Sequence, residues 1–434
     1  MAGRKVAYQN ARLIDPANGL DETGAVLTDG DRIADCGPRL FADGVPDGVE
    51  RVDCAGLCLA PGLIDMQVHV REPGAEHQET FASAGQAAVA GGVTSLAAMP
   101  DTDPVIDDVA LVEYVLRRGN EASPARVYPI AAATKGRGGK QLTELGLLRE
   151  AGARAFSDGN RAIADAMVMR RLLAYASAHD CLIMHHPQEP ALNNGGVMNE
   201  GEVATRLGLG GIPAAAEAIM VERDIRLVEL TGGRYHATLL STEAALDVVR
   251  KAKDKGLPVT CGTAPHYFAL SETDVIDYRT FAKTTPPLRS ENDRRAVAAA
   301  LADGTIDVIV SAHSPRDVES KRLPFAQAAF GVVGLETTLA IALEQHHNGS
   351  VPLAALIRAM TATPAKLLGL DGGRLEPGTP ADLVLFDLDR AWRIDAAKFV
   401  SKSKNSAFDQ KPVQGRVMRT VVAGKPVFDA TDDA

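Results

Sequence analysis

The sequence predicts an α/β protein, a barrel or sheet of parallel strands joined to a small β-domain made from the two ends of the chain. The first observation behind this prediction is an alternation of short apolar runs with amphipathic stretches between about residues 60 and 345. In those stretches apolar residues recur at i, i+3 and i+4, the spacing of one helix face. The second observation is that both ends of the chain replace this alternation with period-2 patterning and glycine-containing turns.

Eight of the apolar runs qualify as strands. They are residues 63–70, 93–99, 126–133, 153–157, 181–186, 234–240, 257–262 and 306–312. Each run is followed by a helical pattern or a long loop, and several of the helical patterns end in glycine. Eight such units are the count of a closed (β/α)8, or TIM, barrel. An open doubly wound sheet is the competing arrangement, which the count alone does not exclude.

The two ends of the chain share a second pattern. Residues 4–58 and 380–429 carry short strand-like runs separated by DG, CG and AG turns, which favours antiparallel sheet. Because both ends depart from the barrel pattern in the same way, we expect them to pair into one β-domain. The expected division is residues 1–58 and 370–434 for that domain and residues 59–369 for the barrel.

The composition excludes several classes of protein. With 434 residues, 46% of them hydrophobic, the chain has ample material for a large core. A formal net charge of -10 and the absence of a long basic run argue against nucleic acid or a membrane surface as partner. The amino-terminal residues lack an apolar signal segment, and no stretch approaches the length of a membrane span. Five scattered cysteines fit buried thiols in a reducing compartment, so we expect a cytoplasmic protein.

In a (β/α)8 barrel the chemistry lies at the carboxyl ends of the strands. The polar residues near those ends are Gln67, His69, Arg71, Asp101, Asp158, His185, His186, His266 and His313. One histidine at a strand end is more often a packed residue than a metal ligand. When several histidines converge on one barrel mouth, a metal-ligand role becomes about as expected as a packing role.

A set of segments spread over most of the chain forms a recognisable pattern. They are PGLIDMQVHVREPG, AGGVTSLAAMPDTDPV, ARAFSDGNR, GGVMNEGEVATRLGLGGIPAAAE, TTPPLRSENDR, LADGTIDVIVSAHSP, AAFGVVGLETTL, GGRLEPGTPADLVLFD and KSKNSAF. With these segments the chain resembles dihydroorotases of the amidohydrolase superfamily nearly from end to end. The resemblance implies a (β/α)8 barrel with a composite β-sandwich from both termini. It also implies a two-metal site and a pyrimidine pocket at the barrel mouth.

Half of the metal ligands implied by the resemblance are missing. The H-x-H pair at the end of the first strand is Gln67 and His69 here, so one histidine is lost. The sixth-strand histidine falls on Leu239. The eighth-strand aspartate, which in the family binds metal and acts as general acid and base, falls on Ala312. Without a carboxylate at that position, nothing there transfers a proton.

The retained ligand positions are too few for zinc. They are His69, Asp158 in the place of the metal-bridging carboxylate, and His186 in the place of the fifth-strand histidine. Zinc requires about four N, O or S ligands, and neither leucine nor alanine coordinates metal. We therefore expect no catalytic residue set and no bound cofactor, with one weakly bound zinc as the alternative.

The substrate pocket implied by the resemblance is half kept. Arg71 and His313 match the positions that grip the carboxylate of dihydroorotate, a task that suits a guanidinium fork. Asp101 and Thr285 stand where similar enzymes use asparagines for the pyrimidine ring. Asp101 would place negative charge beside an anionic substrate and lower its affinity. Structural hydrogen bonding is the preferred interpretation of Arg71 and His313.

Three functions are compatible with this pattern. The preferred one is a non-catalytic homologue with a structural role, because similar silent chains partner aspartate transcarbamoylase in some bacterial assemblies. We then expect a homodimer that contacts the transcarbamoylase through the Gly-rich, weakly charged loop at residues 190–212. The second is an active dihydroorotase or related cyclic amidohydrolase with a rearranged site that recruits His185, His266 or Cys261. The third is an anion-binding or sensing module.

Overall fold

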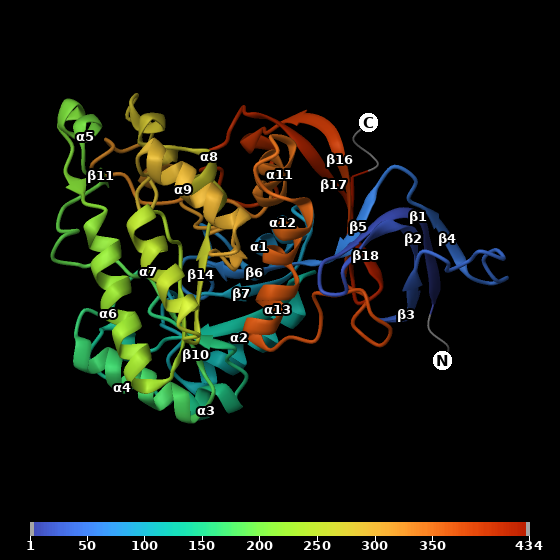
Figure 1. Cartoon of the computed structure of the whole chain (residues 1–434), viewed down its shortest axis with the longest axis horizontal. Coiled ribbons are helices and arrows are strands. Elements are labelled where there is room, and N and C mark those ends of the chain that lie inside the picture. Colours follow the sequence, from blue (N-terminus) through green and yellow to red (C-terminus); the bar gives the residue numbers. More distant parts are fainter. Residues whose placement is uncertain (1–3, 431–434) are drawn as a thin grey trace.

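The computed structural model describes residues 4–430 and contains a central barrel of parallel strands (Figure 1). Its strands are β6 (Leu63–Val68), β7 (Val93–Ala98), β8 (Arg126–Ala131), β9 (Ala155–Phe156), β10 (Leu182–His185), β13 (Arg234–Ala237), β14 (Val259–Thr263) and β15 (Val308–Ile309). They lie side by side in chain order, all parallel, and a bridge between Val68 and His313 joins the last strand to the first. A doubly wound sheet would reverse its strand order part-way, so the barrel prediction is confirmed.

Each of the eight expected strands is present, but most end earlier than expected. The run 234–240 contains β13, which ends at Ala237, and the run 306–312 contains only the two residues of β15. The apolar residues that follow are buried in the loops at the carboxyl ends of the strands instead. Sequence periodicity does not separate a buried strand from a buried loop that continues it.

Helices surround the barrel on its outer side. The longer ones are α1 (Phe81–Ala90), α2 (Val109–Ala122), α4 (Ala166–Ala178), α6 (Ala215–Thr231), α7 (Glu243–Asp254), α9 (Glu291–Ala302), α11 (Thr338–His347), α12 (Leu353–Met360) and α13 (Ala362–Leu368). Shorter ones are α3 (Leu145–Glu150), α8 (Pro265–Ala269) and α10 (Val318–Lys321). Several begin at a side chain that accepts a backbone N–H, such as Asp108 at α2 and Thr242 at α7. These caps fix where each helix starts after its loop.

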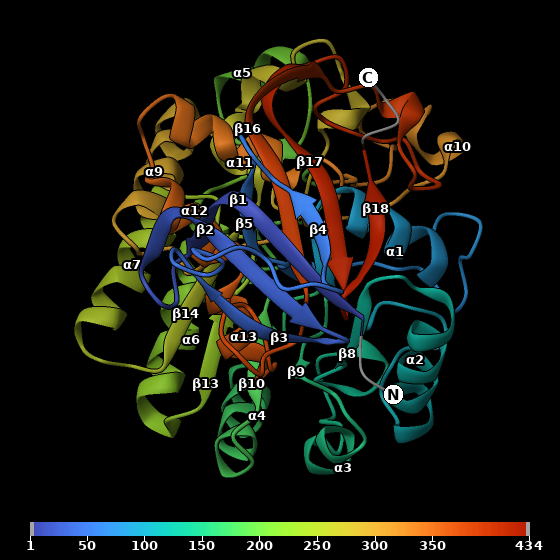
Figure 2. The same cartoon turned by 90° about the vertical axis from the view of Figure 1, so that its right-hand side faces the viewer.

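The two ends of the chain form one mixed sheet beside the barrel, which lies on the right in Figure 1 and faces the viewer in Figure 2. Its strands are β1 (Lys5–Asp15), β2 (Leu20–Asp29), β3 (Arg32–Gly37), β4 (Glu50–Asp53), β5 (Cys58–Pro61), β16 (Leu383–Arg393), β17 (Pro412–Val422) and β18 (Lys425–Asp429). The amino-terminal half joins the carboxyl-terminal half where β5 pairs antiparallel with β16. We call this sheet the terminal sheet.

The terminal sheet differs from the expected antiparallel sandwich in two respects. β1 runs parallel to both β4 and β5, because period-2 patterning defines a half-buried strand but not its direction. The strands also form one continuous hydrogen-bonded sheet. Side chains of the terminal sheet, among them Tyr8, Leu13 and Leu385, form an apolar cluster separate from the barrel core. The amino-terminal part of the sheet extends to Pro61, past the expected boundary at residue 58.

The loop at residues 190–212 folds into ordered structure. It contains β11 (Met198–Asn199), α5 (Glu202–Leu207) and β12 (Gly211–Ile212), with β11 and β12 paired. Met198 and Ile212 are buried, and Leu209 packs against the barrel core. Several apolar side chains of this segment are therefore buried within the chain, and its contact with the transcarbamoylase stays a prediction. Within residues 4–430, no helix is long and apolar enough to cross a membrane.

Candidate ligand site at the barrel mouth

Asp101 lies between His69 and Arg71 at the carboxyl ends of β6 and β7. One carboxylate oxygen is 2.6 Å from Nδ1 of His69, and the other accepts a hydrogen bond of 2.8 Å from Nη1 of Arg71. All three side chains are only 7–8% exposed. Burial acts to raise the pKa of Asp101, but His69 and Arg71 outweigh it and hold that pKa well below its usual range. Burial also lowers the pKa of His69, so at pH 7 its neutral ring donates a hydrogen bond and Arg71 carries the positive charge. The carboxylate is therefore ionised and paired on both oxygens.

This arrangement corrects the expectation that Asp101 presents a free negative charge to an anionic ligand. Its charge is compensated by Arg71, and His69 adds a hydrogen bond. Nη2 of Arg71 donates to Oγ of Ser314 at 2.9 Å, and Nε is buried without a hydrogen-bond partner among residues 4–430. The guanidinium fork that suits a substrate carboxylate thus already holds an internal one.

His313 is also held by an internal carboxylate. Its Nδ1 accepts the backbone N–H of Gly334 at 3.3 Å, so Nε2 carries the proton and lies 3.3 Å from Glu79. Glu79 is fully buried and further accepts from the hydroxyl of Ser401. Burial acts to raise its pKa, whereas the hydrogen bonds from His313 and Ser401 lower it, with a net downward shift. Arg71 and His313 each hold a separate internal carboxylate.

Asp158 and His186, the other two retained ligand positions, are buried beside the strand ends. Both oxygens of Asp158 accept from Thr134, one from its backbone N–H at 2.9 Å and one from its hydroxyl. Nε2 of His186 is 3.2 Å from the amide oxygen of Gln188, while its Nδ1 has no partner in the described chain. Burial lowers the pKa of His186 to about 4, so its ring is neutral at pH 7. Thr285 lies at the edge of this pair, its hydroxyl 3.5 Å from the same Gln188 oxygen.

The positions that lost their ligands keep an unusual backbone. Leu239 has φ 54° and Ala312 has φ 50°, in the left-handed region that residues with a side chain seldom occupy. Both are buried, as is Gln67 on β6. Such a conformation costs about 1–2 kcal/mol per residue and is usually found at functional sites. Both positions therefore keep a costly backbone conformation, although neither side chain binds metal.

The residues present do not fit a zinc centre. In the part of the chain that is described, no group of three or more His, Cys, Asp or Glu residues is placed to hold a metal ion. The hydrogen bond at Nδ1 of His69 leaves its Nε2 as a donor, and Asp158 keeps lone pairs beside its bonds to Thr134, so the retained positions His69, Asp158 and His186 supply at most three donors. A tetrahedral zinc needs about four free donors, and even a catalytic zinc needs about three from the protein.

The residues named for a rearranged site are used elsewhere. His185 donates from Nδ1 to Asp224 at 2.7 Å, and its Nε2 accepts the backbone N–H of Ile163 at 2.9 Å. Cys261 is buried on β14 with its sulfur 3.2 Å from a backbone carbonyl, and burial raises the pKa of this thiol strongly. His266 lies in α8, where burial lowers its pKa to about 3. His185 has no ring nitrogen left for a metal, and Cys261 is not a thiolate at neutral pH.

Comparison with known proteins agrees with the fold and the resemblance. Residues 56–245 match a family model described as dihydro-orotase-like, and residues 346–428 match one described as the amidohydrolase family. A dihydroorotase from Ehrlichia chaffeensis is 43% identical over 427 residues, covering 98% of this chain and 95% of the relative. One from Pelobacter propionicus is 44% identical over 420 residues, covering 97% of this chain and 98% of the relative.

The chain belongs to the dihydroorotase family.

Solved structures show the fold of this dihydroorotase-family chain. An L-hydantoinase (dihydropyrimidinase) from Arthrobacter aurescens superposes with a TM-score of 0.88 at 23% identity, covering 99% of this chain and 96% of the other. A D-hydantoinase (dihydropyrimidinase) from Thermus sp. gives a TM-score of 0.83 at 23% identity, covering 98% and 95%. At such low sequence identities the structural similarity supports the fold of the barrel and the terminal sheet, but it assigns no role to any residue.

Sequence reasoning missed the residues that engage the expected site from within the chain. They are Glu79, Thr134, Gln188, Ser314 and Ser401. Glu79 carried the one usable signal, a carboxylate directly before the apolar start of α1. The others lie in polar loops, where residue type alone does not indicate a partner.

Proposed function

We propose that this member of the dihydroorotase family does not carry out metal-dependent hydrolysis and has a structural role in pyrimidine biosynthesis. The observation that supports the proposal is the closed pairing of Asp101 with His69 and Arg71. This pairing occupies a guanidinium N–H of Arg71, the residue matched to the substrate-gripping position, and Nδ1 of His69, while Nε2 of His69 stays outside it. Together with Gln67, Leu239 and Ala312 at the lost positions, it leaves neither a zinc donor set nor a proton-transferring carboxylate.

The partner in this proposal is aspartate transcarbamoylase. The chain would form a homodimer in the cytoplasm and act as a scaffold for that enzyme. The surface that favours a partner lies around α5, at the end of the barrel opposite the terminal sheet (Figure 1). Large exposed apolar residues gather there: Leu192, Ile219, Ile276 and Tyr278. The hydroxyl of Tyr278 donates to the carbonyl of Leu207 at 2.9 Å, and the backbone of Glu189 bonds that of Ala216, so these segments lie together. Grouped exposed apolar side chains are typical of protein contacts.

A second candidate function is an active dihydroorotase or related zinc-dependent cyclic amidohydrolase with a rearranged site. The comparisons by themselves favour it, because relatives that cover nearly the whole chain are named dihydroorotases. The small number of possible metal ligands at the barrel mouth favours the non-catalytic, structural role. The anion-binding alternative lacks such support, because Arg71 and His313 each hold an internal carboxylate.

Two measurements on the purified chain distinguish these candidates. We expect elemental analysis to find less than one zinc per chain and dihydroorotate to turn over no faster than in buffer. About two chelator-removable metals per chain, with turnover lost on chelation, would establish the second candidate instead.

A separate experiment tests the partner. The chain is co-expressed with aspartate transcarbamoylase and the mixture is separated by size exclusion, with the transcarbamoylase activity assayed in each fraction. We expect co-elution at micromolar concentration, and co-elution should be lost in an Ile219→Asp variant that keeps its fold. Separate elution together with full activity of the transcarbamoylase alone would contradict the scaffold role.

A further inference from the structure

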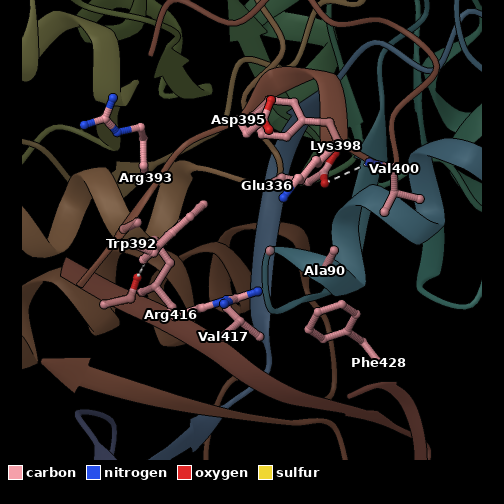
Figure 3. Close-up of a pocket in the computed structure, with 15 residues that line it drawn as sticks. Ala90, Glu336, Trp392, Arg393, Asp395, Lys398, Val400, Arg416, Val417 and Phe428 are labelled. Carbon is pink, nitrogen blue, oxygen red and sulfur yellow. Dashed lines mark hydrogen bonds between the residues drawn. The ribbon is translucent and has the colours of Figure 1, made fainter. Parts of the chain in front are cut away.

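A cavity of about 660 Å³ lies between the barrel and the terminal sheet, away from the barrel mouth (Figure 3). Its walls come from the end of α1, the start of α11, and strands β16, β17 and β18. The segment 395–400, which contains the short 3-10 helix η4 (Ala396–Lys398), closes a further side. None of the residues considered above for the mouth lines it. Cavities of about 300–1,000 Å³ are the usual size for sites that bind small molecules.

Aromatic side chains form part of the wall. They are Trp392, Phe399 and Phe428, from three different segments. The indole N–H of Trp392 donates to the carbonyl of Gly415 at 2.9 Å, which fixes the plane of the ring. Trp392 is only partly buried and is the single tryptophan of the chain. A fixed and partly exposed indole offers a flat surface on which a planar ring can stack.

Cationic side chains lie beside this aromatic wall. Figure 3 shows Arg416 extending from β17 into the space between Trp392 and Phe428. Its guanidinium carbon is 5.9 Å from the centre of the indole ring. Lys398 lines the cavity from η4, and Arg393 also belongs to its lining but points away from the other labelled side chains. Arginine and lysine next to an aromatic surface suit a ligand that is both planar and anionic.

Two carboxylates complete the lining, Glu336 and Asp395. Each is oriented by the backbone: Glu336 accepts the N–H groups of Val400 and Ser401 at 3.0 and 3.1 Å, and Asp395 accepts that of Ala397 at 3.1 Å. A carboxylate oxygen accepts more than one hydrogen bond, so both retain capacity for ligand hydroxyls. A purely anionic aromatic molecule would not use these acceptors, whereas a sugar would.

We propose that this cavity binds a nucleoside 5′-monophosphate. The base would stack on Trp392, the ribose hydroxyls would donate to the carboxylates, and the phosphate would face Arg416 and Lys398. Stacking is tolerant of base identity because every base has a π-face. None of the candidate ligand residues of the mouth lines the cavity, so the proposal does not require that the chain hydrolyses anything.

Intrinsic fluorescence tests the proposal directly, because the only tryptophan stands in the cavity wall. We expect saturable quenching of the full chain by AMP and by UMP, at concentrations where adenosine, uridine and inorganic phosphate each bind at least about tenfold more weakly. Equal binding of phosphate alone would rule out the nucleoside part of the site. Equal binding of the nucleosides would rule out the role of the cations. No saturable response to either nucleotide would overturn the proposal.

Variants localise the binding by calorimetry. Trp392→Leu should weaken AMP binding by about tenfold or more through loss of stacking, and Lys398→Gln by about tenfold through loss of one charge-assisted contact. Lys255→Gln is the matched control, an exposed lysine on the far side of the barrel that pairs with Glu229. Equal weakening by Lys398→Gln and Lys255→Gln would show non-specific charge binding and overturn the assignment. Folding of each variant is checked by circular dichroism before titration.

Discussion

The paired Asp101 leads to a sharp prediction for Asp101→Asn, which removes the charge and keeps the shape. The side chain is only 7% exposed, and its two oxygens hold His69 and Arg71. Removing one partner of a buried ion pair typically costs about 3–5 kcal/mol, because the other charge stays buried and uncompensated. The asparagine oxygen still accepts one hydrogen bond, so we expect the free energy of unfolding to fall by about 3 kcal/mol, at the lower end of that range.

The assay is urea denaturation of both proteins at pH 7, with Asp21→Asn as the matched control. Asp21 also uses both carboxylate oxygens, here with Arg12 alone at 2.7 and 2.9 Å, but its side chain is 41% exposed. We expect the control to change stability by less than about 1 kcal/mol, since solvent weakens exposed pairs. If Asp101→Asn lowers the free energy of unfolding by no more than the control does, Arg71 is not held as a buried charge. The interpretation that its guanidinium is paired with Asp101 inside the chain would then be wrong.

The same pair gives a pH dependence with a defined sign. The pKa of Asp101 is lower in the folded chain than in the unfolded one, so its contribution to stability is complete above the unfolded value of about 4. It is lost as the pH falls below that value toward the folded pKa. Asp101→Asn should therefore lose less stability than the wild-type chain between about pH 4 and pH 2. An identical loss in both would contradict the ionised pair.

Three further predictions follow from the mouth and its surroundings. The triple change Gln67→His, Leu239→His and Ala312→Asp should raise chelator-removable zinc above the wild-type level, measured by elemental analysis, since the left-handed backbone at Leu239 and Ala312 is already in place. Chelator should leave the melting temperature of the wild-type chain unchanged, and a large drop would reveal a structural metal. Burial lowers the pKa of Lys321 to about 7, well below its unfolded value, so stability should rise between about pH 7 and pH 10. Lys321→Met should flatten that rise in denaturation curves taken across this range.

The barrel could be predicted from the sequence because its signals are local. Each strand and helix carries its own periodicity, and the count of alternating units limits the topology. The candidate mouth residues followed from the same reasoning, since polar residues at strand ends must face one another in a barrel. Their actual partners did not follow. Glu79 meets His313 across 234 residues of sequence, and no pattern in the chain indicates that pairing.

Two other features were beyond sequence reasoning for a different reason. The parallel course of β1 beside β5 depends on how β2, β3 and β4 bring the chain back between them, which strand patterning does not encode. The left-handed backbone at Leu239 and Ala312 is held by the surrounding structure against the preference of both residues. Neither residue type gives a local signal for that conformation.

The pairing of β5 with β16 has a consequence for folding during translation. Leu59 is made early, yet its neighbour Leu385 leaves the ribosome near the end of synthesis. Strands β1–β5 therefore present an unpaired edge throughout translation of the barrel, and such an edge is a template for wrong pairing. The half-sheet stays incomplete for most of the synthesis of the chain. Expression in a host with little chaperone capacity should therefore give mainly aggregates of nascent chains. Slower growth at lower temperature should favour the folded protein.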